Sequence, residues 1–132
     1  MMKTSKGEEK IISILKKEKI PFEREKKFQD MKKYGNNLRL DFYLSKEKIA
    51  IEFNGEIHYQ QIKPFHQNES DFKKRQEYDR YKISYCLSHN IKLYIIPYWE
   101  IDKIEESCDL FQDKFLARSR WKNDLDWREY KK

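Results

Sequence analysis

The order of apolar patterns along the chain predicts an α/β fold in which helices flank a mixed β-sheet. Apolar residues recur at helical spacing in three segments, near residues 5–19, 70–88 and 100–116. Alternating or continuous apolar runs predict strands near residues 21–28, 38–44, 49–53 and 91–98. The 132 residues are 38% hydrophobic and 15% aromatic, which is enough apolar material for one compact core.

A capping box predicts where the first helix begins. "SKGE" places Ser5 and Glu8 in the S-x-x-E arrangement, and we expect the helix to run from about Ser5 to Lys19. Its apolar positions follow at helical spacing: Ile11, Ile12, Ile14 and Leu15. Pro21 lacks a backbone N–H and disfavours helical geometry in the residue before it, so it should end the helix and lead into the strand "PFEREKKF".

"LRLDFYL" and "IAIEF" flank the polar stretch "SKEK" and predict a β-hairpin, which the turn sequence "YGNN" precedes. If Leu44 pairs with Ile49, the same register brings Asp41 opposite Glu52. Residues opposite each other have Cβ atoms about 5 Å apart, where two unit charges repel by roughly 3 kcal/mol at an effective dielectric constant of about 20. A bound cation, a shared proton or exposure to water would each offset this repulsion. The residues alone leave these three explanations open.

The second half of the chain predicts a helix, a strand and a further helix. Asn54 and Gly55 either make a tight turn into another strand, "EIHYQQI", or open a loop. A helix from about Ser70 to Ser88 follows, capped by Ser70 or Asn68. "IKLYIIPY" then predicts a buried strand that could lie at the centre of the sheet, and "EIDKIEESCDLFQDKFL" predicts an amphipathic helix.

We expect residues 1–116 to form a single domain and residues 117–132 to be a basic, aromatic extension that packs on that domain or extends it. The extension mixes cations with the rings of Trp121, Trp127 and Tyr130. Such a surface could bind nucleic acid, but we favour a terminal helix that docks its tryptophans on the core.

The composition indicates a protein that works inside a cell. Its 29 Lys and Arg against 23 Asp and Glu give a net charge of +6, spread along the chain, which fits a phosphate-rich partner or an ordinary surface. Cys86 and Cys108 lack the spacing of a disulfide framework or a zinc site. The polar N-terminus and the absence of a long apolar segment predict a cytoplasmic protein with no membrane partner. The excess of lysine over arginine suggests an AT-rich genome, such as that of a virus or a mobile element.

Five segments, taken in order, resemble the PD-(D/E)XK nucleases, and among them the small domains related to very-short-patch-repair endonucleases and EDxHD homing endonucleases. The segments are "SKGEEKI", "LRLDFYL", "IEFNGEIHY", "RQEYDRYKISYC" and "IKLYIIPY", and they span Ser5 to Tyr98. The resemblance implies a restriction-endonuclease-like three-layer sandwich. It also implies a small endonuclease that uses Mg²⁺ or Mn²⁺ to hydrolyse phosphodiester bonds in double-stranded DNA, as a site-specific nickase or a homing or mobile-element enzyme.

The resemblance also assigns roles to individual residues. Asp41 and Glu52 would hold the metal ion, and Glu8 would be an accessory carboxylate, although its neighbour Glu9 could take that place. Glu8 also completes the capping box, and the two roles can coexist. His58 would act as general acid or base, because its ordinary pKa lies close to neutral pH.

Asn54 departs from the family pattern, which has a lysine two residues after the second acid. Either the chain has lost activity, or it belongs to the branch that uses histidine, in which case a loop at Gly55 must return His58 to the acids. Lys82 is a second candidate for the missing lysine, because in this family the lysine can migrate to the following helix. An ion pair between Lys82 and Asp79, one helical turn away, is the interpretation we favour.

The main alternative function is a catalytically inert nucleic-acid-binding module that retains the nuclease fold, and a protein-interaction domain is a third. The chain is short and has little room for a separate recognition domain. A homodimer or a larger protein partner would therefore supply sequence specificity.

Overall fold

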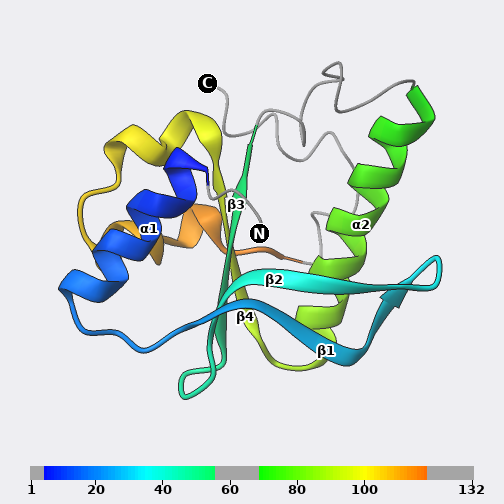
Figure 1. Ribbon diagram of the computed structural model, residues 1–132, viewed down its shortest axis with the longest axis horizontal. Helices are drawn as coiled ribbons and strands as arrows, with labels where there is room; N and C mark the ends of the chain where they lie inside the picture. The colour runs from blue at the N-terminus through cyan, green and yellow to red at the C-terminus, as the bar shows by residue number, and fades with distance from the viewer. Residues whose placement is uncertain (1–4, 56–68, 119–132) are drawn as a thin grey trace.

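Four strands form one mixed sheet between helices (Figure 1). The computed structural model describes residues 5–55 and 69–118. Its elements in chain order are α1 (Lys6–Lys17), β1 (Glu23–Lys33), β2 (Asn36–Leu44), β3 (Ile49–Asn54), α2 (Glu69–Ser88), β4 (Lys92–Pro97), the 3₁₀ helix η2 (Tyr98–Lys103), α3 (Ser107–Leu110) and the 3₁₀ helix η3 (Asp113–Phe115). The strand order is β1-β2-β3-β4, with β3 and β4 parallel and the other neighbours antiparallel. The predicted α/β class with a mixed sheet is therefore confirmed.

Helix α1 begins where the capping box predicts. Ser5 is the N-cap: its Oγ accepts a hydrogen bond from the Glu8 N–H at 3.2 Å, and Glu8 Oε1 accepts one from the Ser5 N–H at 3.4 Å. The helix ends at Lys17, slightly before the predicted Lys19. Its apolar stripe is buried against the sheet and includes Ile11, Ile14 and Leu15.

Apolar side chains cover both faces of the sheet. The α1 side also draws on the segment after β4, and its core contains Ile11, Ile14, Leu15, Phe42, Leu44, Ile51, Tyr94, Ile96, Ile104, Leu110 and Phe115. The α2 side contains Met31, Leu38, Leu40, Tyr43, Ala50, Ile83, Tyr85, Cys86, Ile91, Leu93, Ile95 and Ala117. The sheet is thus the middle layer between two helical sides.

Strand β2 changes the face that it presents at Asp41. Leu40 packs on the α2 side, whereas Phe42 and Leu44 pack on the α1 side. Side chains two residues apart share a face in a regular strand, so β2 must roll between Leu40 and Phe42. Beside this point in β1, Glu25 has a left-handed φ of 52°. The alternation in the sequence placed Leu40 with Phe42 and so did not predict this roll.

Strand β1 is longer than the predicted first strand, because it continues to Lys33 and forms a hairpin with β2. Tyr34 and Gly35 form the turn, with φ values of 54° and 77°. Positive φ at both positions is the geometry of a tight hairpin turn, so the turn predicted at "YGNN" is confirmed. The tip of the hairpin lies against α2 (Figure 1), with the rings of Tyr34 and Tyr78 5.9 Å apart.

Strand β4 is an edge strand of the sheet as far as the structure describes it, whereas the sequence suggested a central position. Its residues from Leu93 to Pro97 are still buried because a later segment covers the open edge. The Ala117 N–H donates to the Leu93 carbonyl at 2.8 Å, and Tyr94 forms a β-bridge with Leu116. This cover explains why an edge strand can carry a continuous apolar run.

The prediction of one amphipathic helix over residues 100–116 is wrong. The structure has three short pieces there: the end of η2, α3 and η3. Asp109 Oδ2 accepts hydrogen bonds from the Glu105 and Glu106 N–H groups at 2.9 and 3.1 Å. The Ser107 N–H donates to the Glu18 carboxylate at 2.7 Å. Such side-chain bonds to the backbone compete with helical hydrogen bonds, so a regular helix does not form.

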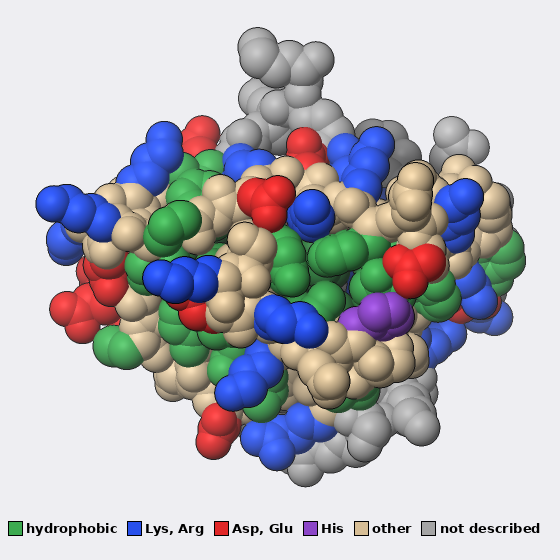
Figure 2. Space-filling model, turned by 90° about the horizontal axis from the view of Figure 1, so that it is seen from below, with side chains coloured by type: hydrophobic (Ala, Val, Ile, Leu, Met, Phe, Trp, Pro, Cys, Tyr) green, Lys and Arg blue, Asp and Glu red, His purple; other side chains and the backbone are tan. Residues whose placement is uncertain are grey.

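Lys and Arg side chains are spread over the face shown in Figure 2, with carboxylates between them. This agrees with the dispersed net charge of +6 in the sequence. Within the described ranges, no helix is both long enough and apolar enough to cross a membrane.

Gly7 allows α1 to approach β3 closely. A Cβ atom at this position would lie 2.3 Å from Cζ of the Phe53 ring, far inside van der Waals contact. Gly7→Ala should therefore lower the free energy of unfolding by about 1–2 kcal/mol. This loss is expected although alanine is the better helix former by about 1 kcal/mol. Urea denaturation measures the change.

Gly55→Ala is the matched control, because no atom lies within 4 Å of a Cβ built at Gly55. A Gly7→Ala variant as stable as the Gly55→Ala variant would contradict the close approach of α1 to β3.

Candidate active site

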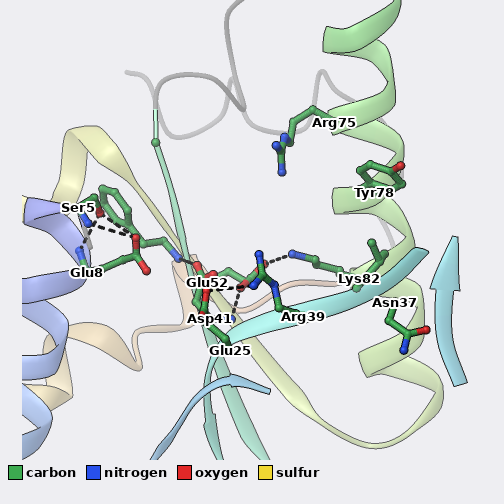
Figure 3. A pocket seen from close by; sticks show the side chains of 13 residues that line it. Ser5, Glu8, Glu25, Asn37, Arg39, Asp41, Glu52, Arg75, Tyr78 and Lys82 are labelled. Carbon is green, nitrogen blue, oxygen red and sulfur yellow. Dashed lines mark hydrogen bonds and ion pairs between the residues drawn. The ribbon is translucent and has the colours of Figure 1, made fainter. Parts of the chain in front are cut away.

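A cavity of about 490 Å³ opens between α1, α2 and the first three strands (Figure 3). Most of the residues that line it have polar or charged side chains: Ser5, Glu8, Glu25, Asn37, Leu38, Arg39, Asp41, Glu52, Phe53, Gly55, Arg75, Tyr78 and Lys82. In Figure 3, Asp41 and Glu52 lie between Glu8 from α1 and Lys82 from α2. The fold thus brings four of the residues singled out in the sequence into one cavity.

Strands β2 and β3 part where the two acids lie. Their ladder pairs Phe42 with Ile51, Tyr43 with Ala50 and Leu44 with Ile49, as predicted, and β3 continues to pair with β4 as far as Asn54. At the point of parting, the Asp41 N–H donates to Glu52 Oε2 at 2.6 Å. The Phe53 N–H donates to Asp41 Oδ2 at 3.0 Å. Each carboxylate is therefore fixed by the backbone of the opposite strand.

Lys82 extends from α2 to the acid pair. Its Nζ donates to Glu52 Oε1 at 2.7 Å, and the side chains of Lys82 and Glu52 are only 14% and 5% exposed. We favoured an ion pair between Lys82 and Asp79 from the sequence, and that interpretation missed the contact with Glu52. The reason is that α2 packs on the sheet with this side of the helix, so Lys82 faces β3 as well as its own helix.

Burial and charge act together on the protonation of this cluster. Burial raises the pKa of Asp41 well above its ordinary value, and the Glu52 carboxylate raises it further. Burial alone would lower the pKa of Lys82, but the charges of Glu52, Asp41 and Asp79 outweigh it and raise that pKa. Lys82 therefore stays protonated at neutral pH. When Asp41 is ionised its negative charge is unfavourable here, and a further cation would stabilise it.

Glu8 lines the cavity from the first turn of α1, whereas Glu9 is exposed and does not belong to the lining. Glu8 Oε2 accepts a hydrogen bond from Arg24 Nη2 at 2.8 Å, and Glu8 Oε1 accepts one from Ser5 Oγ at 3.0 Å. The guanidinium carbon of Arg24 lies 4.8 Å from the centre of the Phe42 ring. These contacts hold Glu8 in place, so its capping role and a place in the cavity coexist.

The donor atoms at the acid pair fit a hard divalent cation. Asp41 and Glu52 offer carboxylate oxygens only, and Mg²⁺ is commonly held by one or two carboxylates, with water and substrate phosphate completing its shell. Within residues 5–55 and 69–118, no three His, Cys, Asp or Glu side chains lie close enough to hold a metal ion together. A cation here would therefore be shared with solvent or substrate.

The sequence also predicts Asn54 and His58 as site residues. Asn54 is buried at the end of β3, 2% exposed, in register with Pro97 of β4, and it does not line the cavity. His58 lies outside the described residues, as do the turn and strand predicted after Gly55 and most of the extension predicted over residues 117–132. A role for His58 therefore stays a prediction.

Several polar residues of the cavity are not among the residues predicted for the site. Arg39 is two residues before Asp41, so strand alternation alone could have placed both on one side. Arg75, Tyr78 and Lys82 recur at positions i, i+3 and i+7 of α2, which is one helical stripe. The helical spacing of these residues is visible in the sequence, but a polar helical stripe usually faces solvent and does not by itself predict a site.

Replacing Asp41 by asparagine should stabilise the fold when no divalent cation is present. Because the pKa of Asp41 is raised on folding, its ionisation costs stability. That cost appears as the pH rises from the unfolded value of about 4 through the higher folded value. Asp41→Asn should therefore melt about 2–5 °C above the wild type at pH 8 in EDTA, with the difference vanishing near pH 4.

Thermal unfolding followed by circular dichroism measures both values. The control is Asp102→Asn, which alters an exposed acid and should leave the melting temperature unchanged. An Asp41→Asn variant that melts below the wild type at pH 8 would show that the acid pair is not strained.

Comparisons with known proteins find viral relatives for about half of the chain. The uncharacterized protein 307L of invertebrate iridescent virus 6 is 40% identical over 67 residues, which are 50% of this chain and 34% of that protein. The uncharacterized protein 094L of frog virus 3 is 40% identical over 65 residues, which are 48% of this chain and 42% of that protein. The chain thus spans less than half the length of either relative. No family model and no solved structure gives a significant match.

Proposed function

We propose that the protein is a small Mg²⁺-dependent endonuclease that hydrolyses phosphodiester bonds in double-stranded DNA, with Mn²⁺ able to replace Mg²⁺. One observation carries the proposal: Asp41, Glu52 and Lys82 form a partly buried, hydrogen-bonded cluster that borders an open cavity. A cluster that only stabilised the fold would need one acid for the lysine. Here a second acid lies beside the first and its pKa is raised, which is typical of a functional site.

The proposal includes the restriction-endonuclease-like fold. A helix bearing Glu8 precedes the sheet, Asp41 and Glu52 lie on adjacent antiparallel strands, and a helix then leads to a parallel strand. This order is the one that the resemblance to PD-(D/E)XK nucleases implies. The cavity at the point where β2 and β3 part supports the same assignment.

Asp41 and Glu52 would hold the metal ion. When bound, Mg²⁺ polarises the scissile phosphate and lowers the pKa of a bound water. The backbone N–H groups of Asp41 and Phe53 orient the two carboxylates before any ion arrives, so little reorganisation is required on binding. Glu8, held by Arg24, would add a third negative group at the α1 side of the cavity.

Lys82 would supply from α2 the positive charge that the family pattern places at Asn54. Because the acids raise its pKa, Lys82 serves as a fixed cation and not as a base at neutral pH. Its ammonium would stabilise the charge that builds up on the phosphate in the transition state. Proton transfer would then need another group, and His58 remains our candidate for it.

Arg39 and Arg75 line the same cavity and would contact the DNA backbone. The net charge of +6 supports binding to a polyanion, which should weaken steeply as salt is added. The protein would act inside a cell, in the cytoplasm, and a homodimer or larger partner would provide sequence preference. The viral relatives support the expectation of a viral source.

Cleavage of supercoiled plasmid tests the proposal. The wild type should produce nicked or linear DNA with Mg²⁺ and none with EDTA, and Asp41→Ala should not cut. The Lys82→Met variant should cut at least about 100-fold more slowly than the wild type, and it should still bind DNA in EDTA. Lys73→Met is the matched control, because Lys73 is an exposed lysine of the same helix that lines no part of the cavity, and it should cut at the wild-type rate.

A wild type that binds DNA in EDTA but cuts nothing with Mg²⁺ or Mn²⁺ would contradict the proposal. That result would support the alternative, a catalytically inert module that retains the fold. Equal cleavage rates for Lys82→Met and Lys73→Met would show that Lys82 has no role in cleavage. The roles of Asp41 and Glu52 would then rest on the Asp41→Ala variant.

A further inference from the structure

Three tyrosines gather where the β1–β2 hairpin meets α2, and we call them the tyrosine surface: Tyr34, Tyr78 and Tyr81. Tyr34 lies at the hairpin tip and is 55% exposed, an unusual position for so large a ring. Its ring lies edge to face against Tyr78, with centroids 5.9 Å apart. Its hydroxyl donates a hydrogen bond to the Glu77 carboxylate. The ring is therefore held in place and not loose on the surface.

Lysines surround these rings. Lys33 Nζ lies 5.2 Å from the centre of the Tyr34 ring and 5.9 Å from that of Tyr81, and Lys74 Nζ lies 5.5 Å from that of Tyr34. A second cavity, of about 580 Å³, opens beside them and is lined by Lys33, Tyr34, Glu77, Arg80, Tyr81 and Ser84. The lining of this cavity contains two cations, Lys33 and Arg80, and one acid, Glu77.

The tyrosine surface is continuous with the proposed active site. Tyr78 lines the active-site cavity, and its hydroxyl accepts a hydrogen bond from Asn36 Nδ2 at 3.4 Å at the start of β2. From Asn36 to Asp41 is five residues along one strand, or roughly 16 Å at about 3.3 Å per residue. Along the axis of a DNA duplex, where each strand carries one phosphate per about 3.4 Å, that distance corresponds to about five base pairs.

We propose that the tyrosine surface binds an unpaired DNA strand by base stacking, so that the substrate is duplex DNA with a single-stranded segment beside the cleaved bond. The part of this inference that concerns a cleaved bond rests on the proposed function. The binding of an unpaired strand does not depend on it. The exposed Tyr34 ring, with two half-buried tyrosines and two lysines beside it, combines the rings and cations by which proteins hold single strands. In a paired duplex the faces of the bases are stacked on one another. A duplex could therefore contact the lysines through its phosphates but could not stack on the tyrosine rings.

Fluorescence anisotropy in EDTA tests the inference without any cleavage. The probes are one labelled 20-base-pair duplex, the same duplex with an eight-nucleotide thymidine tail at its 3′ or 5′ end, and the same tails made of abasic nucleotides. The abasic tails carry the same phosphates but no bases. The wild type should bind a thymidine tail about tenfold more tightly than the blunt duplex or the abasic tail.

Tyr34→Asn should remove most of that tenfold preference, because asparagine suits the left-handed backbone at this turn but offers no ring. Tyr34→Phe should keep the preference, which separates stacking from the hydroxyl contact with Glu77. Lys33→Gln should weaken binding to thymidine and abasic tails alike. The control is Leu87→Ser, which alters the other large exposed apolar side chain on the described surface and should change nothing.

Equal affinity for blunt, abasic and thymidine-tailed duplexes, or an undiminished preference in Tyr34→Asn, would overturn the inference. A protein that cuts plasmid but shows no tail preference would lose the inference and keep its proposed function. A protein that shows the preference but cuts nothing would lose the nuclease and keep the strand-binding surface.

Discussion

The parting of β2 from β3 at Asp41 and Glu52 is the feature on which the rest of the site depends. Backbone N–H groups released by the parting need acceptors, and the two carboxylates provide them at 2.6 and 3.0 Å. This places two acids together in a partly buried position, where their mutual repulsion must be balanced. Lys82 supplies part of that balance at 2.7 Å, and a divalent cation would supply the rest.

The two helices deliver different groups to this point because they approach it in different ways. Helix α1 comes close because Gly7 leaves room for the Phe53 ring, which brings Glu8 to the cavity. Helix α2 carries long side chains instead, and Lys82 spans the gap to Glu52 with its flexible stem. Under the proposed function, Lys82 would supply from the helix the positive charge that the nuclease pattern places at Asn54.

The sequence predicted local structure well and tertiary relations less well. The capping box of α1, the hairpin register and α2 follow from short patterns whose physical causes are local. The roll of β2 at Asp41, the edge position of β4 and the broken segment after it depend on contacts between distant residues. The acid pair was predictable because it lies directly beyond the last pair of the hairpin ladder, whose register follows from the sequence. The contact of Lys82 with Glu52 was not, because it depends on how α2 lies on the sheet.

X-ray diffraction from crystals grown with Mn²⁺, recorded at the manganese absorption edge, tests the central claim most directly. We expect one anomalous peak at about 2.1 Å from carboxylate oxygens of both Asp41 and Glu52, and no such peak in crystals of Asp41→Asn. That result would establish the acid pair as a metal centre independently of any cleavage assay. Ordered crystals in which Mn²⁺ binds elsewhere, or in which the peak persists in Asp41→Asn, would contradict the claim.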